Sequence, residues 1–266
     1  MKETISSLQN SRIKQIHRLA LKPKERIIQG LFLIEGAREL SLALTGGYLL
    51  DSVFVCRELF SKTDYPDVLK PVDEQKRYEV TRSVFEKIAY REGSDGILAL
   101  MKPKLHRLED LKFPSNPFVI VLEAIEKPGN LGAVLRTADA AKVDAVIVCD
   151  PATDIYNPNV VRSSVGCLFT VPVATATNEE TLLFLREKGI CPYAAALTAC
   201  RWYHETDFTH PSAIVMGTEA EGLSDFWLHE AEQVKIPMRG KIDSLNVSVS
   251  AAVLTFEAMR QRGFLM

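Results

Sequence analysis

The stretch PFVIVLEAIEKPGNLGAVLRTADAAKVDAVIVCD, residues 117–150, shows how the second half of this chain is built. An apolar run over 118–122 leads to a turn at Pro128-Gly129, then to a helical pattern, and then to a second apolar run over 145–149. Apolar strands that alternate with helices are typical of a parallel sheet with helices on both faces. The sequence therefore predicts an α/β fold.

The same alternation extends over most of the chain. It ends in a long helix predicted over about 246–262, and it begins with a basic amphipathic helix predicted over 5–21. Between the two halves, residues 106–116 carry several charges and a proline, which is typical of a linker. We expect two domains, a smaller N-terminal α/β domain over 1–105 and a parallel-sheet domain over 117–266.

Composition excludes several classes of protein. The chain has 266 residues, of which 47% are hydrophobic and 25% charged, and no apolar run reaches the roughly 18 residues that a membrane-spanning helix needs. The polar start MKETISSLQN shows no secretory signal. Five cysteines without a CxxC pair and five histidines without ligand spacing predict free thiols and no metal site. We expect a cytoplasmic protein.

Charge is unevenly distributed. A net charge of −2 does not point to a polyanion partner, yet residues 1–27 hold seven Lys or Arg against two Glu. The candidates for RNA contact in this segment are Arg12, Lys14, Lys22 and Arg26. On charge alone, an ordinary solvated helix face explains the same pattern.

Three loops that follow predicted strands contain the candidate site residues, because ligands of open α/β sheets bind beyond the carboxyl ends of the strands. The first loop and its helix carry Asn130 and Arg136, VMGTEAEGLS carries Gly217 and Glu219, and IPMRGKIDSLNVSVSAAV carries Ser244 and Asn246. Taken singly, each loop also has a plain structural explanation. Asn130, Ser244 and Asn246 are common helix caps, and Glu219 suits a helix N-terminus.

Taken together and in this order, NLGAVLRTA, GTEAEGLS and IPMRGKIDSLNVSVSAA resemble the three signature motifs of the SpoU, or TrmH-type, branch of the SPOUT methyltransferases. The resemblance covers nearly all of residues 117–266. In the first half, GLFLIEGAREL and SDGILALMKP resemble, more weakly, the substrate-binding domain that is often joined to this family.

The resemblance implies a fold and an activity that the residue pattern alone does not give. It implies a Rossmann-like sheet whose C-terminal stretch, here about 213–250, forms a trefoil knot, although true knots are nearly absent from proteins. It also implies transfer of a methyl group from S-adenosylmethionine to a ribose 2′-hydroxyl in structured RNA. Ribosomal RNA is our first expectation and transfer RNA the second, and a homodimer is implied as the assembly.

Residue roles follow from the same resemblance. Gly217, Ile236 and Leu245 match positions that hold the cofactor, with Met238 beside them. The catalytic positions are Asn130, Arg136, Glu219, Ser244 and Asn246. Because arginine stays protonated throughout the accessible pH range, we interpret Arg136 as a phosphate clamp rather than a general base. Arg162, in NPNVVRSSVGCLF, is a further candidate for RNA contact, although a capped helix with one exposed arginine is the plain alternative.

Two other function classes stay open at this point. A catalytically silent RNA-binding protein on the same scaffold would be expected to lose motif residues, whereas Arg136, Glu219, Ser244 and Asn246 are all present. A dehydrogenase needs GxGxxG after its first strand, and KPGNLGAVLR does not contain that spacing. One departure from the family pattern is Lys127, where many relatives carry a small polar or acidic residue.

Overall fold

The computed structural model describes residues 4–60, 65–90 and 93–264. The chain forms two compact units, one made of residues 1–105 and 156–170, the other of residues 106–155 and 171–266. Segment 156–170 therefore packs with the N-terminal unit although it lies within the second half of the sequence. Each unit has its own sheet.

The N-terminal unit is built on a four-stranded mixed sheet with the order β1-β4-β2-β3. Its strands are β1 (Phe32–Glu35), β2 (Leu49–Val55), β3 (Arg77–Glu79) and β4 (Ile97–Lys102). Strand β4 runs antiparallel to both β1 and β2, whereas β3 is parallel to β2. This smaller mixed sheet agrees with the α/β character expected for the first half.

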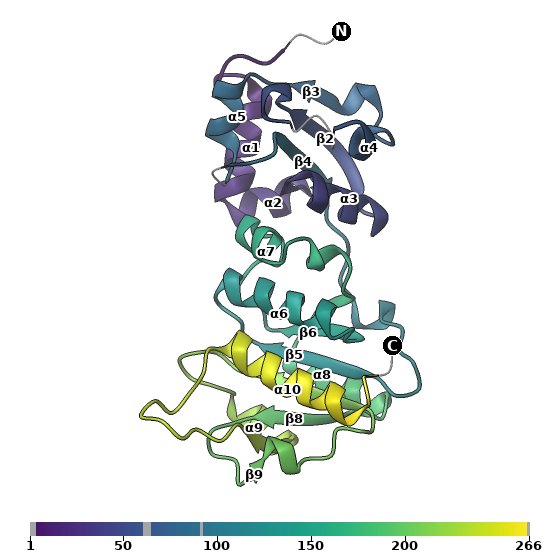
Figure 1. The fold of residues 1–266 in the computed structure, drawn as a ribbon, viewed down its shortest axis with the longest axis vertical. Coiled ribbons are helices and arrows are strands. Elements are labelled where there is room, and N and C mark those ends of the chain that lie inside the picture. Colours follow the sequence, from purple (N-terminus) through teal and green to yellow (C-terminus); the bar gives the residue numbers. More distant parts are fainter. Residues whose placement is uncertain (1–3, 61–64, 91–92, 265–266) are drawn as a thin grey trace. The chain divides into compact units, whose positions relative to one another are not determined.

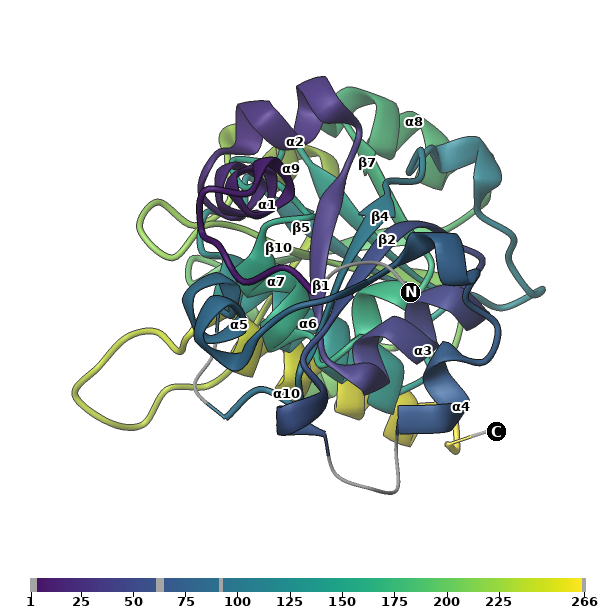
Figure 2. The same ribbon diagram turned by 90° about the horizontal axis from the view of Figure 1, so that it is seen from above.

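Helices cover both faces of this sheet. They are α1 (Ser11–Leu21), α2 (Pro23–Gln29), α3 (Ala37–Thr45), α4 (Tyr65–Leu69), α5 (Arg82–Ile88) and α7 (Pro158–Ser163), with short 3-10 turns at Arg57–Leu59, Glu74–Lys76 and Cys167–Phe169. Helices α1 and α5 lie on one side and α3 and α4 on the other (Figure 2). The apolar residues of α1, Ile13, Ile16 and Leu19, are buried at helical spacing and fix α1 on the sheet.

The first helix is shorter than the sequence pattern predicts. It begins at Ser11 because the side chain of Asn10 accepts a hydrogen bond from the main-chain nitrogen of Arg12 at 2.9 Å, as an N-cap does. Ile5, which we predicted at the start of this helix, instead forms a β-bridge with Val80. The prediction of a helix from Ile5 onward was wrong at its beginning.

The C-terminal unit is built on a seven-stranded sheet with the order β7-β6-β5-β10-β8-β11-β9, and every pairing in it is parallel. Its strands are β5 (Phe118–Glu123), β6 (Ala145–Cys149), β7 (Val173–Ala176), β8 (Cys191–Ala195), β9 (Arg201–Trp202), β10 (Ser212–Met216) and β11 (Glu232–Lys235). The parallel sheet predicted from residues 117–150 is confirmed.

Two pairs of helices cover this sheet. The helices of the unit are α6 (Pro128–Ala140), α8 (Asn178–Glu187), α9 (Asp225–Glu230) and α10 (Val247–Gln261), with 3-10 turns at Leu108–Asp110 and Tyr203–Glu205. Helices α6 and α10 pack on each other and cover one face (Figure 1). The opposite face, which includes Val121 and Val215, packs against Leu185 of α8 and Trp227 of α9. This is the arrangement with helices on both faces that the apolar strands predicted.

The described residues contain neither a group of side chains suited to hold a metal ion nor a helix long and apolar enough to cross a membrane. All five cysteines are free: Cys56, Cys149 and Cys167 are buried, Cys191 is half-buried and Cys200 is exposed. Burial raises the pKa of the Cys149 thiol to about 12. Because the thiolate is the reactive species and a reagent must reach it, we expect the exposed Cys200 to react much faster than the buried cysteines.

We predict that an alkylating reagent at pH 8 labels Cys200 first in the folded protein and leaves Cys149 unmodified, because Cys200 is exposed and the pKa of Cys149 is held near 12. Mass spectrometry of peptides after timed labelling measures this order. In denaturant all five thiols should react at similar rates, which serves as the control. Rapid labelling of Cys149 in the native protein would show that this thiol is accessible to solvent.

Candidate active site

Two of the three candidate loops meet because their strands are neighbours. Strands β5 and β10 pair in parallel, with Leu122 opposite Met216. The loop before α6 and the loop 217–224 therefore leave the sheet at the same edge, where the carboxyl ends of parallel strands lie. The third loop ends at Asn246, the N-cap of α10, and α10 packs along α6.

The carboxylate of Glu219 joins all three loops. Its Oε1 accepts hydrogen bonds from Nδ2 of Asn130 at 2.6 Å and from Nδ2 of Asn246 at 2.5 Å. Nδ2 of Asn246 also lies 3.2 Å from Oδ1 of Asn130. The ammonium group of Lys127 forms an ion pair with Oε2 of the same carboxylate. Four side chains thus form one polar cluster, which we call the Glu219 cluster.

The cap of α10 fixes the orientation of Asn246. Its Oδ1 accepts from the main-chain nitrogen of Ser248 at 3.0 Å and from the Ser248 hydroxyl at 2.6 Å. With the oxygen occupied in this way, Nδ2 must point away from the helix, toward Glu219. The plain structural explanation of Asn246 as a helix cap is therefore correct, and the same side chain also enters the Glu219 cluster.

Gly217 allows the loop after β10 to fold back on itself. A side-chain carbon at this position would lie 2.1 Å from the main-chain carbonyl atoms of Gly222. Thr218 and Gly222 exchange two main-chain hydrogen bonds of 2.8 and 3.2 Å, and Gly222 has a φ of +72°. Only glycine fits at Gly217 without displacement of the backbone. This tight loop carries Glu219 at its tip.

A buried carboxylate anchors the far end of the same loop. Glu123, the last residue of β5, is 4% exposed. It accepts hydrogen bonds from the main-chain nitrogen of Ser224 at 2.8 Å, from the Ser224 hydroxyl at 2.5 Å and from Nδ2 of Asn178 at 2.8 Å. Asn178 in turn accepts from the indole nitrogen of Trp227 at 2.7 Å. Both oxygens of the buried Glu123 and the side-chain amide of Asn178 therefore have partners, so loop 217–224 is held at both ends.

A cleft of about 490 Å³ opens beside this loop. Its walls come from residues 195–198 after β8, residues 217–223, and the stretch from Val234 of β11 to Leu254 of α10. The four residues predicted to hold a cofactor all line it, namely Gly217, Ile236, Met238 and Leu245. Glu219, Glu221 and Asp243 add carboxylates to the lining. A cleft of this size with apolar walls and a few acids suits a nucleoside-sized ligand that carries positive charge.

The remaining predicted catalytic residues do not join the Glu219 cluster. Ser244 lines the cleft, and its hydroxyl donates to Asp243 Oδ1 at 3.2 Å. Arg136 is exposed on α6. Within the part of the chain that the structure describes, its guanidinium makes no hydrogen bond or ion pair. The charge of Arg136 is therefore available to a phosphate.

The predicted RNA contacts all lie in the N-terminal unit and differ in exposure. Lys14 and Lys22 are exposed, whereas Arg12 is half-buried with its guanidinium 4.1 Å from the ring centre of Tyr78. Arg26 is only 4% exposed and donates to the carbonyl oxygen of Leu19 at 2.6 Å. Arg26 therefore supports the C-terminal end of α1 instead of offering its charge to solvent. Arg162 lies over the ring of Tyr90.

Sequence reasoning missed the two residues that hold the site together. Lys127 was noted only as a departure from the family pattern, and Glu123 was not considered. A signal for Glu123 was present, since it is the one acid that directly follows the apolar run FVIVL. A charge at the end of a wholly buried strand has to be satisfied by hydrogen bonds, and this requirement could have marked it.

Fold and site together define a class of protein: an α/β enzyme with a cofactor cleft beyond the carboxyl ends of a parallel sheet. Comparison with known proteins makes the class specific. The family model described as the SpoU rRNA Methylase family matches residues 117–256, and that of the MRM3-like substrate binding domain matches residues 10–99. The chain belongs to the SpoU rRNA methylase family.

Two curated relatives show the extent of the similarity. The 23S rRNA (guanosine(2553)-2′-O)-methyltransferase RlmP of Bacillus subtilis is 29% identical over 253 residues, which are 95% of this chain and 97% of the relative. The 23S rRNA (guanosine-2′-O-)-methyltransferase RlmB of Pectobacterium atrosepticum is 41% identical over 149 residues. This second match spans 55% of this chain and 61% of the relative.

Solved structures extend the similarity to the whole chain. A crystal structure of an RNA 2′-O ribose methyltransferase has a TM-score of 0.86 at 39% identity, and covers 98% of this chain and 99% of that one. The AdoMet-bound rRNA methyltransferase of Sinorhizobium meliloti has a TM-score of 0.89 at 26% identity, with 99% of both chains covered. The predicted family and the predicted fold class are confirmed.

We predict that Gly217→Ala lowers the affinity for S-adenosylmethionine about ten-fold or more, because the added methyl group overlaps the backbone at Gly222 and displaces the loop that lines the cleft. Isothermal titration calorimetry measures the affinity. Gly240→Ala is the matched control, since a side-chain carbon there meets no atom within 4 Å. Equal affinity of Gly217→Ala and wild type would show that the loop does not shape the cofactor site.

Proposed function

We propose that this protein transfers a methyl group from S-adenosylmethionine to a ribose 2′-hydroxyl of ribosomal RNA. The observation that carries the proposal is the Glu219 cluster, which joins one residue from each of the three motif segments beside the cleft. Membership of the SpoU family supports the chemistry. The curated relatives named for ribosomal RNA support that substrate over transfer RNA.

The chain's own residues fit the cofactor. The close backbone approach at Gly217 and the apolar side chains of Ile236, Met238 and Leu245 suit a flat adenine ring, which these residues would hold. The carboxylates of Glu221 and Asp243 suit a cationic sulfonium. When bound, S-adenosylmethionine supplies an activated methyl group. The remaining task of the protein is to place the ribose oxygen in line with that methyl group.

Positioning of the ribose falls to the groups outside the cleft. Glu219 orients the amides of Asn130 and Asn246. Asn130 uses one of its two Nδ2 hydrogens on Glu219 and offers the other to a ribose hydroxyl, whereas both Nδ2 hydrogens of Asn246 are used within the Glu219 cluster. Arg136 holds a neighbouring phosphate with its fixed fork of N–H donors. Because its guanidinium stays protonated, the proton of the 2′-hydroxyl passes to a neighbouring group or to water.

Comparative mapping of 2′-O-methyl groups tests the proposal directly. Ribosomal and transfer RNA from cells with and without this protein are mapped at nucleotide resolution. We expect one ribosomal nucleotide to lose its 2′-O-methyl group when the protein is absent. Loss of a methyl group only in transfer RNA would reassign the substrate, and identical maps would overturn the proposed activity.

We predict that Arg136→Ala lowers kcat/KM for RNA about 100-fold, and that Arg136→Lys lowers it about ten-fold because an ammonium group cannot bind a phosphate with two parallel bonds. Both variants should bind S-adenosylmethionine like wild type, since Arg136 does not line the cleft. Methyl transfer from labelled cofactor to total RNA measures the activity. Undiminished turnover of Arg136→Lys on saturating RNA would contradict the role of a clamp.

We further propose a homodimer, a trefoil knot over about 213–250 and a cytoplasmic location. The dimer is supported by exposed apolar residues on α10: Val249 is 47% exposed and Phe256, seven positions later on the same face, is 43% exposed. A second support is that Arg136 lies on α6 six positions after Asn130 and does not join the Glu219 cluster of its own chain. In a dimer, the arginine of one subunit can complete the site of the other. The knot rests on the family resemblance, and the location on relatives named for ribosomal RNA.

We predict that Phe256→Asp converts the dimer into monomers and abolishes methyl transfer, because a charge cannot be buried without a partner in an apolar interface. Sedimentation equilibrium at micromolar protein measures the mass. Leu183→Asp is the matched control, since Leu183 is likewise a large apolar side chain exposed on a helix: it is 59% exposed and lies on α8, away from α10 in the sequence. A wild-type protein that is monomeric and fully active would contradict the proposed dimer.

A further inference from the structure

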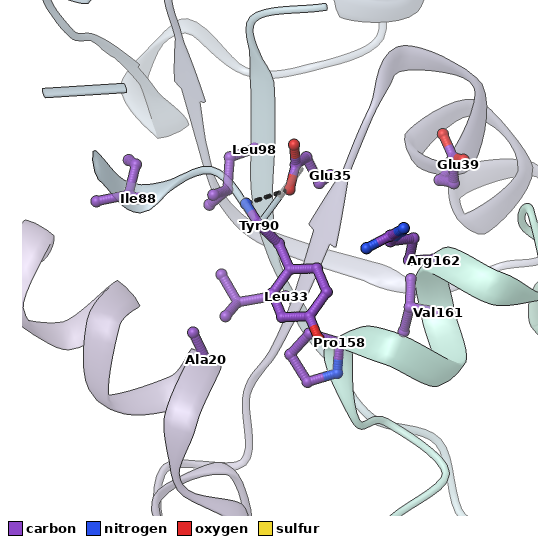
Figure 3. Close-up of a pocket in the computed structure, with 10 residues that line it drawn as sticks. All are labelled: Ala20, Leu33, Glu35, Glu39, Ile88, Tyr90, Leu98, Pro158, Val161 and Arg162. Atoms are coloured by element: carbon purple, nitrogen blue, oxygen red, sulfur yellow. Dashed lines mark hydrogen bonds between the residues drawn. The ribbon is translucent and has the colours of Figure 1, made fainter. Parts of the chain in front are cut away.

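The N-terminal unit contains a second recess, distinct from the cofactor cleft. It lies between β1, β4, α3, α5 and α7, and its walls are apolar side chains such as Leu33, Leu98, Pro158 and Val161 (Figure 3). Four polar or aromatic side chains complete it: Glu35, Glu39, Tyr90 and Arg162. In its present state the enclosed volume is about 30 Å³, room for roughly one water molecule.

Tyr90 and Arg162 form an open pair of planar groups at this recess. Tyr90 is 49% exposed, and its main-chain nitrogen donates to Oε2 of Glu35 at 2.7 Å, which fixes the backbone below the ring. The guanidinium carbon of Arg162 lies 5.7 Å from the centre of the ring. Planar groups in direct contact are roughly 3.5–4 Å apart, so this pair is not closely stacked.

A flat ring fits between these two groups after a small movement. A planar ring that contacts both groups needs a separation of roughly 7 Å, twice the contact distance. Arg162 is exposed, and among the described residues its guanidinium makes no hydrogen bond or ion pair. An outward shift of about 1–2 Å therefore breaks no hydrogen bond or ion pair of Arg162 with a described residue, lengthens only its contact with the Tyr90 ring, and admits the ligand ring.

Glu39 gives the recess its chemical preference. It lies in the first turn of α3, is 5% exposed, and forms no hydrogen bond or ion pair with any described residue. An acid in the first turn is favoured at an exposed helix N-terminus, but that effect does not account for its burial. Its carboxylate oxygens are nevertheless open to solvent, since neither is among the buried side-chain atoms of the described residues that lack a hydrogen-bond partner, and they can accept from a ligand that supplies N–H groups.

We propose that this recess captures the base of an unpaired RNA nucleotide, with guanine the preferred base. The base stacks between the ring of Tyr90 and the guanidinium of Arg162, and Glu39 accepts its N–H donors. Unpaired bases are recognised in this way, through aromatic and arginine planes and through hydrogen bonds to the base edge. Guanine presents an imino and an amino N–H side by side, which match the two oxygens of one carboxylate. That the partner is RNA rests on the proposed function.

Binding of short RNAs tests the stacking. Fluorescence anisotropy compares an unstructured oligoribonucleotide that contains one guanosine with the same sequence containing inosine, which lacks the amino group, or adenosine. Wild type should prefer guanosine. Tyr90→Ala should weaken binding about ten-fold, and Tyr90→Phe, which keeps the ring, should bind within about two-fold of wild type. Equal binding by Tyr90→Ala and wild type, or no binding of unpaired RNA by wild type, would overturn the proposal.

Glu39 offers a readout that a purely structural role would not produce. Glu39→Gln should remove the preference for guanosine over inosine, because an amide offers only one acceptor oxygen. It should leave the midpoint of thermal unfolding nearly unchanged, because the carboxylate oxygens are open to solvent and accept from no described residue. A structural role predicts a lower midpoint. A lower midpoint together with an unchanged base preference would overturn the role of Glu39 as the base reader.

Failure of this inference can be told apart from failure of the proposed function. If wild type methylates RNA and the variants at Tyr90 and Glu39 bind RNA like wild type, only the inference fails. If guanosine-dependent binding requires Tyr90 but no RNA is methylated, only the proposed function fails. Affinity for S-adenosylmethionine should stay unchanged in all these variants, because the recess and the cofactor cleft share no residue.

Discussion

The carboxylate of Glu123 is the constraint on which the catalytic half depends. It ends a strand that is otherwise wholly apolar, and burial of an acid is tolerated only when its oxygens are satisfied. Its donors come from Ser224, at the far end of loop 217–224, and from Asn178, at the start of α8. The need to satisfy one buried charge therefore fixes the loop that lines the cofactor cleft.

Strand order explains how residues so distant in sequence form one site. Asn130 and Glu219 are 89 positions apart, and Asn130 and Asn246 are 116 positions apart, yet their side chains share hydrogen bonds. Because β10 returns to pair in parallel with β5, two loops that follow strands leave the sheet at one edge. Helix α10 packs on α6 and brings its N-cap to the same place. The Glu219 cluster is thus a result of topology as much as of residue choice.

The sequence was sufficient for features that depend on local pattern. Continuous apolar runs predicted the parallel strands, and the N-cap at Asn246 was visible as a residue type at the start of a helix. Features set by tertiary partners were not predictable. A pattern of positive charge cannot separate Lys14, which faces solvent, from Arg26, which caps the end of α1. Segment 156–170 packs with the N-terminal unit because its apolar side chains, such as Val161, are buried there.

Two glutamates of low exposure, Glu123 and Glu39, show that the same residue type can have different roles. Glu123 is surrounded by donors, so its charge contributes to rigidity and to the placement of a loop. Glu39 is 5% exposed as a whole residue, but its oxygens are open to solvent and accept from no described residue, so its charge is available to a ligand. The contrast between a buried carboxylate surrounded by donors and one whose oxygens are open to solvent therefore separates a structural acid from one that is available to a ligand.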